Sequence, residues 1–364
     1  MRRSFIKETA LGIATSLFLI VAISGGVRAE TIHWKMASCW PPSIPLIESD
    51  KKFVKFVNEA SGERLKIKLF TAGQICPPFE LLDNVSSGVV QVGGDWAGYW
   101  AGKDTAFSLI GSFPMLMGAV DYQLWLYEGG GIELCNEVYN KFGVRWLPHS
   151  VLFSESGIRS NKPIESLNDY KGMKIRLSGR PQGEVLKRIG GTQVMLSGGE
   201  IYQALEKGTI DGGEFSGPSL DWPMGFAEVT KYWCSPGWHQ PGSVLSIVIN
   251  QKAWEKLPDD LKKLVECAAM ATFNTGTAWL EYGNINATKK FIEKGVKLSR
   301  LNDEDLAKIQ EISFEVLVNE SKKNPLFAKI AKSQIKFLND MAHWREISAP
   351  FSHGRNVRKL PNID

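Results

Sequence analysis

Hydrophobic and polar positions alternate along the chain in short stretches whose spacing predicts strands and helices in turn. A first strand is predicted over 31–37, and a second over 65–69, where leucine and isoleucine alternate with lysine. Between them, apolar residues recur at helical spacing over 46–60, and Gly62 follows as a stop signal. Strands separated by helices in this way predict an α/β fold with mostly parallel sheets.

The same order of elements continues with clearer boundaries in the middle of the chain. Ser197-Gly198-Gly199-Glu200 has the pattern of a capping box, in which Ser197 and Glu200 bond reciprocally at the start of a helix. The further predicted elements are a helix over 80–87, strands over 89–92, 174–177, 193–196 and 210–213, and helices that begin at Pro181 and Ile201.

Beyond Pro258 the pattern becomes helical. Apolar and small residues from Leu261 to Asn286, Trp279 and Tyr282 among them, fall on one helical stripe. A helix that continues to Phe291 would be roughly 50 Å long, which exceeds the width of one small lobe. A second amphipathic helix is predicted over 303–319, and the tail from Ser348 is rich in Pro, Gly, Asn and Arg.

The first residues have the pattern of an export signal. Arg2, Arg3 and Lys7 precede an uncharged apolar run over 10–24, and Val27-Arg28-Ala29 offers a cleavage site. The run is shorter than the roughly 20 residues that span a bilayer, which argues against the alternative of an uncleaved anchor. The paired arginines resemble a twin-arginine signal, and a Sec signal is the alternative. We therefore expect a periplasmic protein whose mature chain begins near Glu30.

The charge and composition of the chain argue against a nucleic-acid-binding protein. The net charge is +4, and the signal segment contributes four basic residues against one acidic residue, so the mature chain is nearly neutral. No cluster of basic residues is interleaved with aromatic ones, so we expect no nucleic-acid partner. The remaining length is sufficient for two lobes. The five cysteines are scattered and lack CxxC spacing. The sequence does not decide whether one or two disulfides form, and the spacing argues against a metal site made of cysteines.

Signatures of common enzymes are absent from the sequence. The segment 97–103 resembles a phosphate-binding loop only superficially, because Ala97 stands in place of the first glycine and Asp104 in place of Ser or Thr. Neither an HExxH motif nor a Gly-x-Ser-x-Gly elbow occurs. These absences favour a binding protein over an enzyme.

Three segments rich in glycine and aromatic residues follow predicted strands: 93–100, 213–218 and 236–242. Ligands of α/β proteins bind beyond the carboxyl ends of the strands, so these segments are natural pocket walls. The alternative is that their tryptophans only fill a core.

An ordered set of motifs over 171–176, 190–194 and 201–212 resembles the DctP family, the extracytoplasmic solute receptors of TRAP transporters. The resemblance extends from Thr31 to about Lys336. Segments 214–218 and 232–242 are most similar to the branch that binds 2-oxo acids and other monocarboxylates.

The resemblance implies a two-lobed periplasmic binding protein fold with crossing hinge strands and a long bracing helix. Its partners are then a small organic anion and the TRAP membrane permease subunits, and a homodimer is compatible with it. The implied organisation is a signal peptide 1–29, lobe I 30–153, lobe II 154–242, a hinge strand, long helix and C-terminal helices 243–347, and a tail 348–364.

The resemblance also implies that Arg176 pairs with the substrate carboxylate. A guanidinium is a rigid two-pronged donor that matches a carboxylate and never loses its charge. A solvated arginine at a strand end is the alternative. The residues expected around the substrate are Trp96, Tyr99, Phe153, Phe215 and Trp238 as walls, and His239 as a donor to a keto or hydroxyl oxygen.

Some members of this branch hold a cation, Na⁺ or Ca²⁺, between protein and substrate. Glu214 matches its carboxylate ligand, and the Phe215 carbonyl matches a second ligand. The third ligand, a glutamine side chain, aligns with Phe153, which cannot coordinate, so Ser154 or Glu155 would have to replace it.

The expected function is therefore a solute receptor without catalytic activity. One alternative is a secreted enzyme acting on a carboxylate, with Glu214 or His239 as general base. The other is a ligand-sensing protein that uses the same fold.

Overall fold

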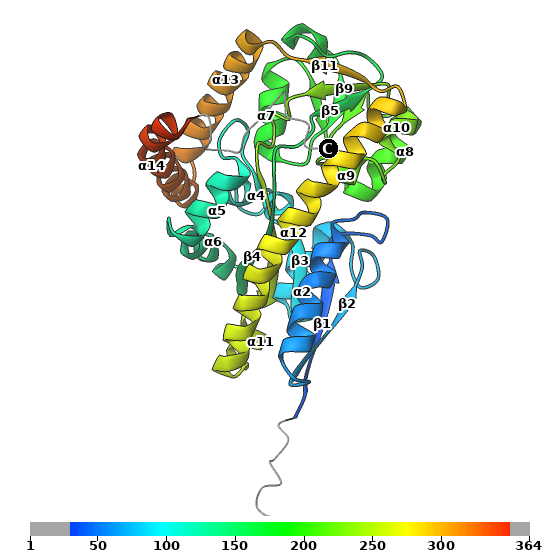
Figure 1. Cartoon of the computed structure of the whole chain (residues 1–364). Coiled ribbons are helices and arrows are strands. Elements are labelled where there is room, and N and C mark those ends of the chain that lie inside the picture. Colours follow the sequence, from blue (N-terminus) through cyan, green and yellow to red (C-terminus); the bar gives the residue numbers. More distant parts are fainter. Residues whose placement is uncertain (1–29, 350–364) are drawn as a thin grey trace, which may run out of the picture.

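The structure, a computed structural model, describes residues 30–349. It confirms the α/β class, because two separate sheets are each covered by helices (Figure 1). The predicted signal peptide 1–29 and nearly all of the predicted tail lie outside the described residues.

The first sheet has the strand order β2-β1-β3-β10-β4. Its strands are β1 (Ile32–Ser38), β2 (Leu65–Phe70), β3 (Val92–Trp96), β4 (Val144–Leu152) and β10 (Ser243–Asn250). β1 runs parallel to β2 and β3, whereas β10 is antiparallel to both β3 and β4. All eight residues of β10 are buried, and five of them are apolar, as expected for a central strand.

The second sheet has the order β11-β9-β5-β8-β6-β7 and is built from short strands. They are β5 (Ile158–Ser160), β6 (Lys174–Arg176), β7 (Thr192–Val194), β8 (Gly212–Gly213), β9 (Tyr232–Ser235) and β11 (Lys297–Arg300). The chain passes from the first sheet to the second between β4 and β5, and returns between β9 and β10. The predicted lobe boundaries stay a prediction, and these two passages lie close to them.

Helices surround both sheets. Their bounds are α2 (Ile47–Ala60), α3 (Leu81–Ser86), α4 (Phe107–Gly111), α5 (Ala119–Tyr127), α6 (Gly131–Asn140), α7 (Arg180–Arg188), α8 (Ile201–Glu206), α9 (Pro218–Asp221), α10 (Phe226–Val229), α11 (Gln251–Glu255), α12 (Asp259–Glu293), α13 (Asp303–Ser321) and α14 (Pro325–Ser348). The predicted capping box before α8 is present, with the Ser197 amide donating to Glu200 Oε2 at 2.9 Å.

Helix α12 is the predicted long helix. Its 35 residues extend about 52 Å, from β4 and α2 beside the first sheet to α9 beside the second (Figure 1). The predicted stripe is correct only in the first half. Trp279 and Tyr282 are 41% and 73% exposed, and Leu280, Ala287 and Phe291 are buried instead, because the second half faces a different partner, α9.

The predicted strand over 89–92 is wrong, because β3 begins at Val92 and includes the glycines that were expected in a turn. Val89 is 55% exposed, in the turn after α3. Gly94 allows the strand to approach α2 closely, since a Cβ on it would collide with the Asp50 carboxylate. The pattern missed this strand because it carries small and polar residues.

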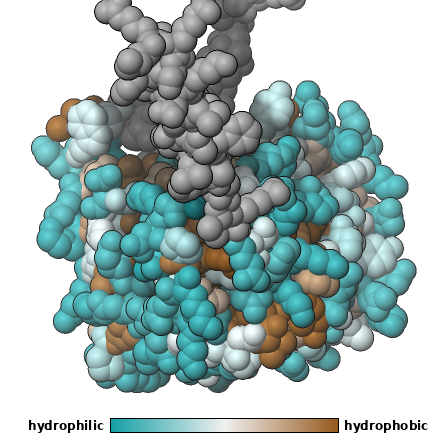
Figure 2. Space-filling view, turned by 90° about the horizontal axis from the view of Figure 1, so that it is seen from below, coloured by the Kyte–Doolittle hydropathy of each residue, from teal (hydrophilic) through white to brown (hydrophobic). Residues whose placement is uncertain are grey.

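The five cysteines all have free thiols, four of them buried, so the disulfides considered from the sequence do not form here. None of the described helices is long and apolar enough to cross a membrane. The face seen from below is mostly hydrophilic, and its hydrophobic side chains form patches between polar ones (Figure 2).

Candidate functional site

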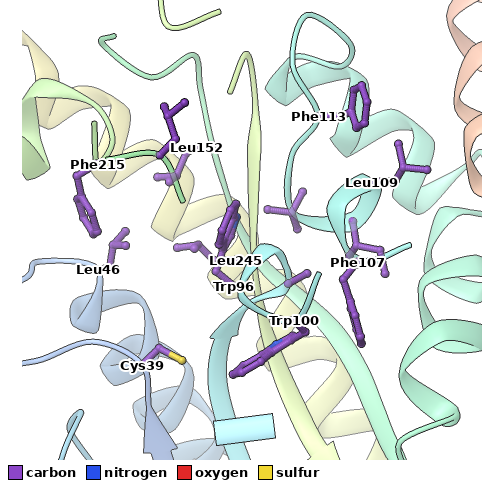
Figure 3. Packing of buried hydrophobic residues seen from close by; sticks show 14 of the residues in the cluster. Cys39, Leu46, Trp96, Trp100, Phe107, Leu109, Phe113, Leu152, Phe215 and Leu245 are labelled. Atoms are coloured by element: carbon purple, nitrogen blue, oxygen red, sulfur yellow. The ribbon is translucent and has the colours of Figure 1, made fainter. Parts of the chain in front are cut away.

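A small cavity lies where strand ends of the two sheets meet. Its walls come from segments far apart in the sequence, as Phe215, Leu46, Leu152, Trp96 and Leu245 illustrate (Figure 3). The lining side chains are Trp40, Leu46, Trp96, Tyr99, Leu152, Glu155, Arg176, Ser178, Phe215, Gln240, Ser243 and Leu245. Its free volume is about 20 Å³, which is space for about one water molecule, so an organic ligand has to enter before the lobes close fully or displace these walls.

Arg176, at the end of β6, is 1% exposed and faces this cavity. Its Nε and Nη2 donate to the Leu196 carbonyl at 3.0 and 2.9 Å, and Nη1 donates to the Glu214 carbonyl at 2.9 Å. These backbone acceptors fix the plane of the guanidinium before any ligand is present. Arg176 is thus a buried side chain at the cavity and not a solvated one, and its pairing with a substrate carboxylate stays a prediction.

Glu214 follows β8 and is also 1% exposed. Its Oε1 lies 3.0 Å from Arg176 Nη1 and accepts the Ser178 amide at 2.7 Å. Its Oε2 is buried without a hydrogen-bond partner. One oxygen of this carboxylate is thus held by protein donors, and the other remains free to bind a further group.

Glu155 and His239 complete a buried cluster with Glu214. The candidate ligand atoms of these three residues lie within 4.8 Å of one another. Glu155 Oε2 is 3.0 Å from His239 Nε2, and both side chains are at most 4% exposed. The cluster brings two carboxylates together beside Arg176, which is an arrangement able to hold a cation.

Burial sets the protonation of this cluster. It raises the pKa of the Glu155 carboxyl well above its usual range, and the nearby Glu214 charge adds to the rise. It also lowers the pKa of His239 to about 4, so the imidazole is neutral near pH 7. Burial likewise raises the pKa of Tyr99, which therefore keeps its proton and faces the cavity as a hydroxyl.

Aromatic rings form the apolar walls. The Tyr99 ring lies 5.3 Å from Trp96 and 6.1 Å from Trp40 between centroids, and Phe215 meets Trp40 edge to face at 6.4 Å. Trp96 Nε1 donates to Ser243 Oγ at 2.9 Å, which fixes the indole between β3 and β10. Trp96, Tyr99 and Phe215 therefore lie where the sequence predicted.

Three predicted residues lie elsewhere. Phe153 is 39% exposed and faces a surface hollow beside α12, so it does not line the cavity. Trp238 is a core side chain whose Nε1 donates to the Tyr170 hydroxyl at 3.0 Å. His239 contacts Glu155 instead of lining the cavity.

A larger groove of about 500 Å³ lies between α7 and α13. Lys187 and Lys323 on its rim are exposed, and it lacks the buried, converging polar groups of the small cavity. We therefore assign the ligand site to the small cavity.

A model of the bacterial extracellular solute-binding proteins, family 7, the DctP family, matches residues 36–323. The chain belongs to this family. The expected TRAP-transporter receptor fold is thereby confirmed.

Similar proteins support this assignment. A monocarboxylate 2-oxoacid-binding periplasmic protein of Nostoc sp. is 30% identical over 96% of this chain and 97% of its own length. A TRAP transporter solute-binding protein of Bordetella bronchiseptica, a dimer with calcium and picolinate, superposes with a TM-score of 0.84 at 30% identity, covering 87% and 95% of the two chains. One from Pseudoalteromonas atlantica, with sodium and pyruvate, gives 0.83 at 30% identity, covering 88% and 97%.

Sequence reasoning missed several walls of this DctP-family site. Trp40 lies two residues after the end of β1, so the rule that ligands bind at carboxyl ends of strands could have found it. Gln240 lies in the third of the glycine-rich segments, in which Trp238 and His239 were the predicted site residues. Ser178 carried no signal, because an isolated serine after a strand is common.

Proposed function

We propose that this family member is a periplasmic receptor that binds a 2-oxo acid or a similar small monocarboxylate. The ligand carboxylate pairs with Arg176, the lobes close over it, and the complex delivers it to the membrane permease of a TRAP transporter. The ligand leaves unchanged, because the proposed role requires no covalent step.

The observation that carries the proposal is the burial of Arg176 at the cavity. A permanently charged side chain is almost never fully buried without a partner, and here two backbone carbonyls orient it toward the interior. A ligand carboxylate can replace Glu214 Oε1 as a partner of Nη1 without any change in the guanidinium plane. Such preorganisation lowers the entropic cost of binding.

A cation beside the ligand carboxylate is the second component of the proposed site. The two relatives described above hold calcium or sodium together with picolinate or pyruvate. In this chain, Glu214 Oε2 is a free buried ligand atom, and Glu155 lies beside it. These carboxylates, with the Phe215 carbonyl as predicted, would hold Na⁺ or Ca²⁺, which neutralises the negative charge that faces the ligand. Phe153 takes no part in such a site.

The walls support a short, compact ligand. Trp40, Tyr99 and Phe215 enclose the space next to Arg176, and Leu46, Leu152 and Leu245 close its apolar side. A 2-oxo acid with a small side chain presents a carboxylate and a carbonyl to the polar end and carbon atoms to these rings.

A thermal-shift screen of small carboxylates tests the proposal, because a ligand that binds only the folded state raises the apparent stability. Pyruvate and related 2-oxo acids should raise the melting temperature in a concentration-dependent manner, and neutral sugars should not. Addition of a chelator should reduce the shift if calcium bridges the ligand. Stabilisation by no carboxylate at all would contradict the proposed function.

Two further expectations belong to the same proposal. Ligand recovered after long incubation should give an unchanged NMR spectrum, whereas a converted product would favour the enzyme alternative. Light scattering should show whether the protein forms a dimer, as the Bordetella relative does.

A further inference from the structure

A surface hollow beside α12 exposes apolar side chains. The hollow has a volume of about 550 Å³ and lies between α5, α12 and the segment that connects the lobes. Phe153, Tyr282 and Ile285 line it and are 39%, 73% and 51% exposed, and the buried Phe273 forms its floor. Exposed apolar side chains that gather around a hollow mark a surface that another segment covers. We refer to this surface as the α12 hollow.

The α12 hollow carries a negative charge. Among the described residues that line it, Glu281 is the one charged side chain. The Asn284 amide donates to Glu281 Oε2 at 3.0 Å, and within the described part of the chain this carboxylate has no cationic partner within 4.0 Å. The segment that complements this surface should therefore combine apolar side chains with a positive charge.

The sequence that follows α14 has this character. Residues 350–364 contain three basic residues against one acidic residue, with apolar residues placed among them. Arg355 and Arg358 are two of the basic residues, and Phe351 and Leu360 are two of the apolar ones. The segment thus offers both kinds of group that the hollow lacks.

The end of α14 lies close to the α12 hollow. Arg345, in the last turn of α14, donates to Asp121 of the neighbouring helix α5 (Figure 1). Gln123, two residues further along α5, lines the hollow. The fifteen residues of 350–364 extend up to roughly 50 Å, which exceeds the roughly 14 Å length of α5. The hollow is therefore within reach of this segment.

We propose that residues 350–364 dock in the α12 hollow of the same chain. Their apolar residues pack against Phe153, Tyr282 and Ile285, and a basic residue pairs with Glu281. A segment tethered this close acts at an effective concentration on the order of millimolar, so a weak site is sufficient to hold it. The inference is independent of the proposed function, because the hollow and the small cavity share no lining residue.

The test is fluorescence anisotropy with a labelled peptide of sequence 350–364, titrated with the mature chain and with a variant that ends at Ala349. The truncated variant should bind the peptide, and the full chain, whose hollow is filled, should bind it at least tenfold more weakly. In the truncated chain, Ile285→Asp should weaken peptide binding at least tenfold. Val318→Asp, at an equally exposed apolar position of α13, is the matched control and should bind as the truncated parent does.

A charge reversal tests the ion pair. Glu281→Lys in the truncated chain should weaken binding of the natural peptide by roughly two- to fivefold, as expected for an exposed pair. A peptide that carries Arg355→Glu and Arg358→Glu should bind this variant more tightly than the natural peptide does. The opposite order of affinities would contradict the pairing.

Circular dichroism verifies that each protein is folded before titration. Peptide binding by neither chain, equal binding by the full and truncated chains, or undiminished binding by truncated Ile285→Asp would overturn the inference. Light scattering identifies the other possible occupant. A dimer of the full chain that dissociates on truncation would place the segment in the hollow of a second copy and overturn docking in the same chain.

Discussion

At the scale of single residues, Arg176 is a buried charged side chain whose donors are nearly all bonded to protein acceptors. Its donors are distributed between the Leu196 carbonyl, which holds it in place, and Glu214, which contributes both a carbonyl and a carboxylate. The carbonyls set the orientation, and the carboxylate is the partner that a ligand can replace. In the proposed function, the ligand carboxylate takes the place of Glu214 Oε1 at Nη1.

Because Arg176 and Glu214 are buried together, we expect Arg176→Ala to lower stability in the absence of ligand. Breaking a buried pair by removing one partner costs about 3–5 kcal/mol, since the other charge is left unpaired. Urea unfolding at pH 7 measures the loss, and Glu214→Gln in the same background should recover part of it. A stability equal to that of wild type would mean that the pair does not form.

The aromatic walls give a second prediction at this scale. Phe215→Ala should weaken binding of pyruvate by roughly ten- to a hundredfold, because the ring closes the cavity above Arg176 and packs on Trp40. Phe153→Ala removes a ring of the same size outside the cavity and should leave the affinity unchanged. Titration calorimetry compares the two variants, and a greater effect of Phe153→Ala would contradict the site described here.

The sequence singled out Arg176 and Glu214 through the resemblance to the family, and Trp96, Tyr99 and Phe215 because they lie in glycine-rich segments at the ends of strands. It aligned the third cation ligand with Phe153 and left Ser154 or Glu155 as replacements, and it also expected Phe153 in the wall of the pocket. Phe153 and Glu155 are two residues apart in an irregular segment between β4 and β5, and only the tertiary fold determines which of them enters the cavity.

At the scale of elements, the segment between β4 and β5 connects the lobes and carries Glu155. Gly157 in this segment has φ +113°, and a Cβ there would collide with the Cys234 carbonyl of β9. No other residue type adopts this conformation readily. The close approach keeps β5 paired with β9, and the Glu155 amide donates to the Gln240 carbonyl of the returning segment 236–242.

We therefore expect Gly157→Ala to reduce both stability and ligand affinity. Backbone strain alone costs about 1–3 kcal/mol, and relief of the collision would displace Glu155. Gly102→Ala, at a position where a Cβ meets no atom within 4 Å, is the control. Thermal unfolding and pyruvate titration of both variants test the prediction, which is wrong if Gly157→Ala behaves like the control.

Asp95 on β3 joins several elements of the first sheet. Its buried carboxylate accepts hydrogen bonds from Trp100 Nε1 at 2.6 Å, from the Tyr139 hydroxyl of α6 at 2.9 Å, and from Ser246 Oγ of β10. Burial nevertheless raises the pKa of Asp95 from 3.8 to about 6, and these donors offset only part of the rise. The protonated form is therefore favoured by folding.

This pKa predicts a pH dependence with a definite sign. Between pH 4 and 6 the folded state binds more protons at Asp95 than the unfolded state does, so its contribution to stability is lost as the pH rises through this range. The Asp95→Asn variant has no titratable group at this position. The free energy of unfolding of wild type minus that of the variant should therefore fall from pH 4 to pH 6. Urea unfolding at several pH values measures the difference, and a constant or rising difference would contradict the pKa.

Elements with a strong apolar period were predictable, as α2, β2 and α12 illustrate. β3 was not, because glycines and Asp95 replace the expected apolar residues where the strand approaches α2. The buried face of the second half of α12 was not predictable either, since it depends on contact with α9, which is distant in sequence.

At the scale of the whole molecule, residues of both lobes line the candidate site, which neither lobe could form alone. The first lobe supplies Trp40, Trp96 and Tyr99, and the second supplies Arg176 and Phe215. Gln182 on α7 donates to the carbonyls of Ser112 and His239, and its bond to Ser112 joins the second lobe to the first. Closure of two lobes around a ligand is the usual motion of such receptors.

The central claim is that Arg176 binds the ligand carboxylate between the lobes. Titration calorimetry with pyruvate, in the presence of calcium, tests it on folded wild type, Arg176→Ala and Arg180→Ala, the last at an exposed position on the rim of the larger groove. The account predicts that Arg176→Ala weakens binding at least a hundredfold and that Arg180→Ala binds as wild type does. Wild-type affinity in folded Arg176→Ala would contradict it.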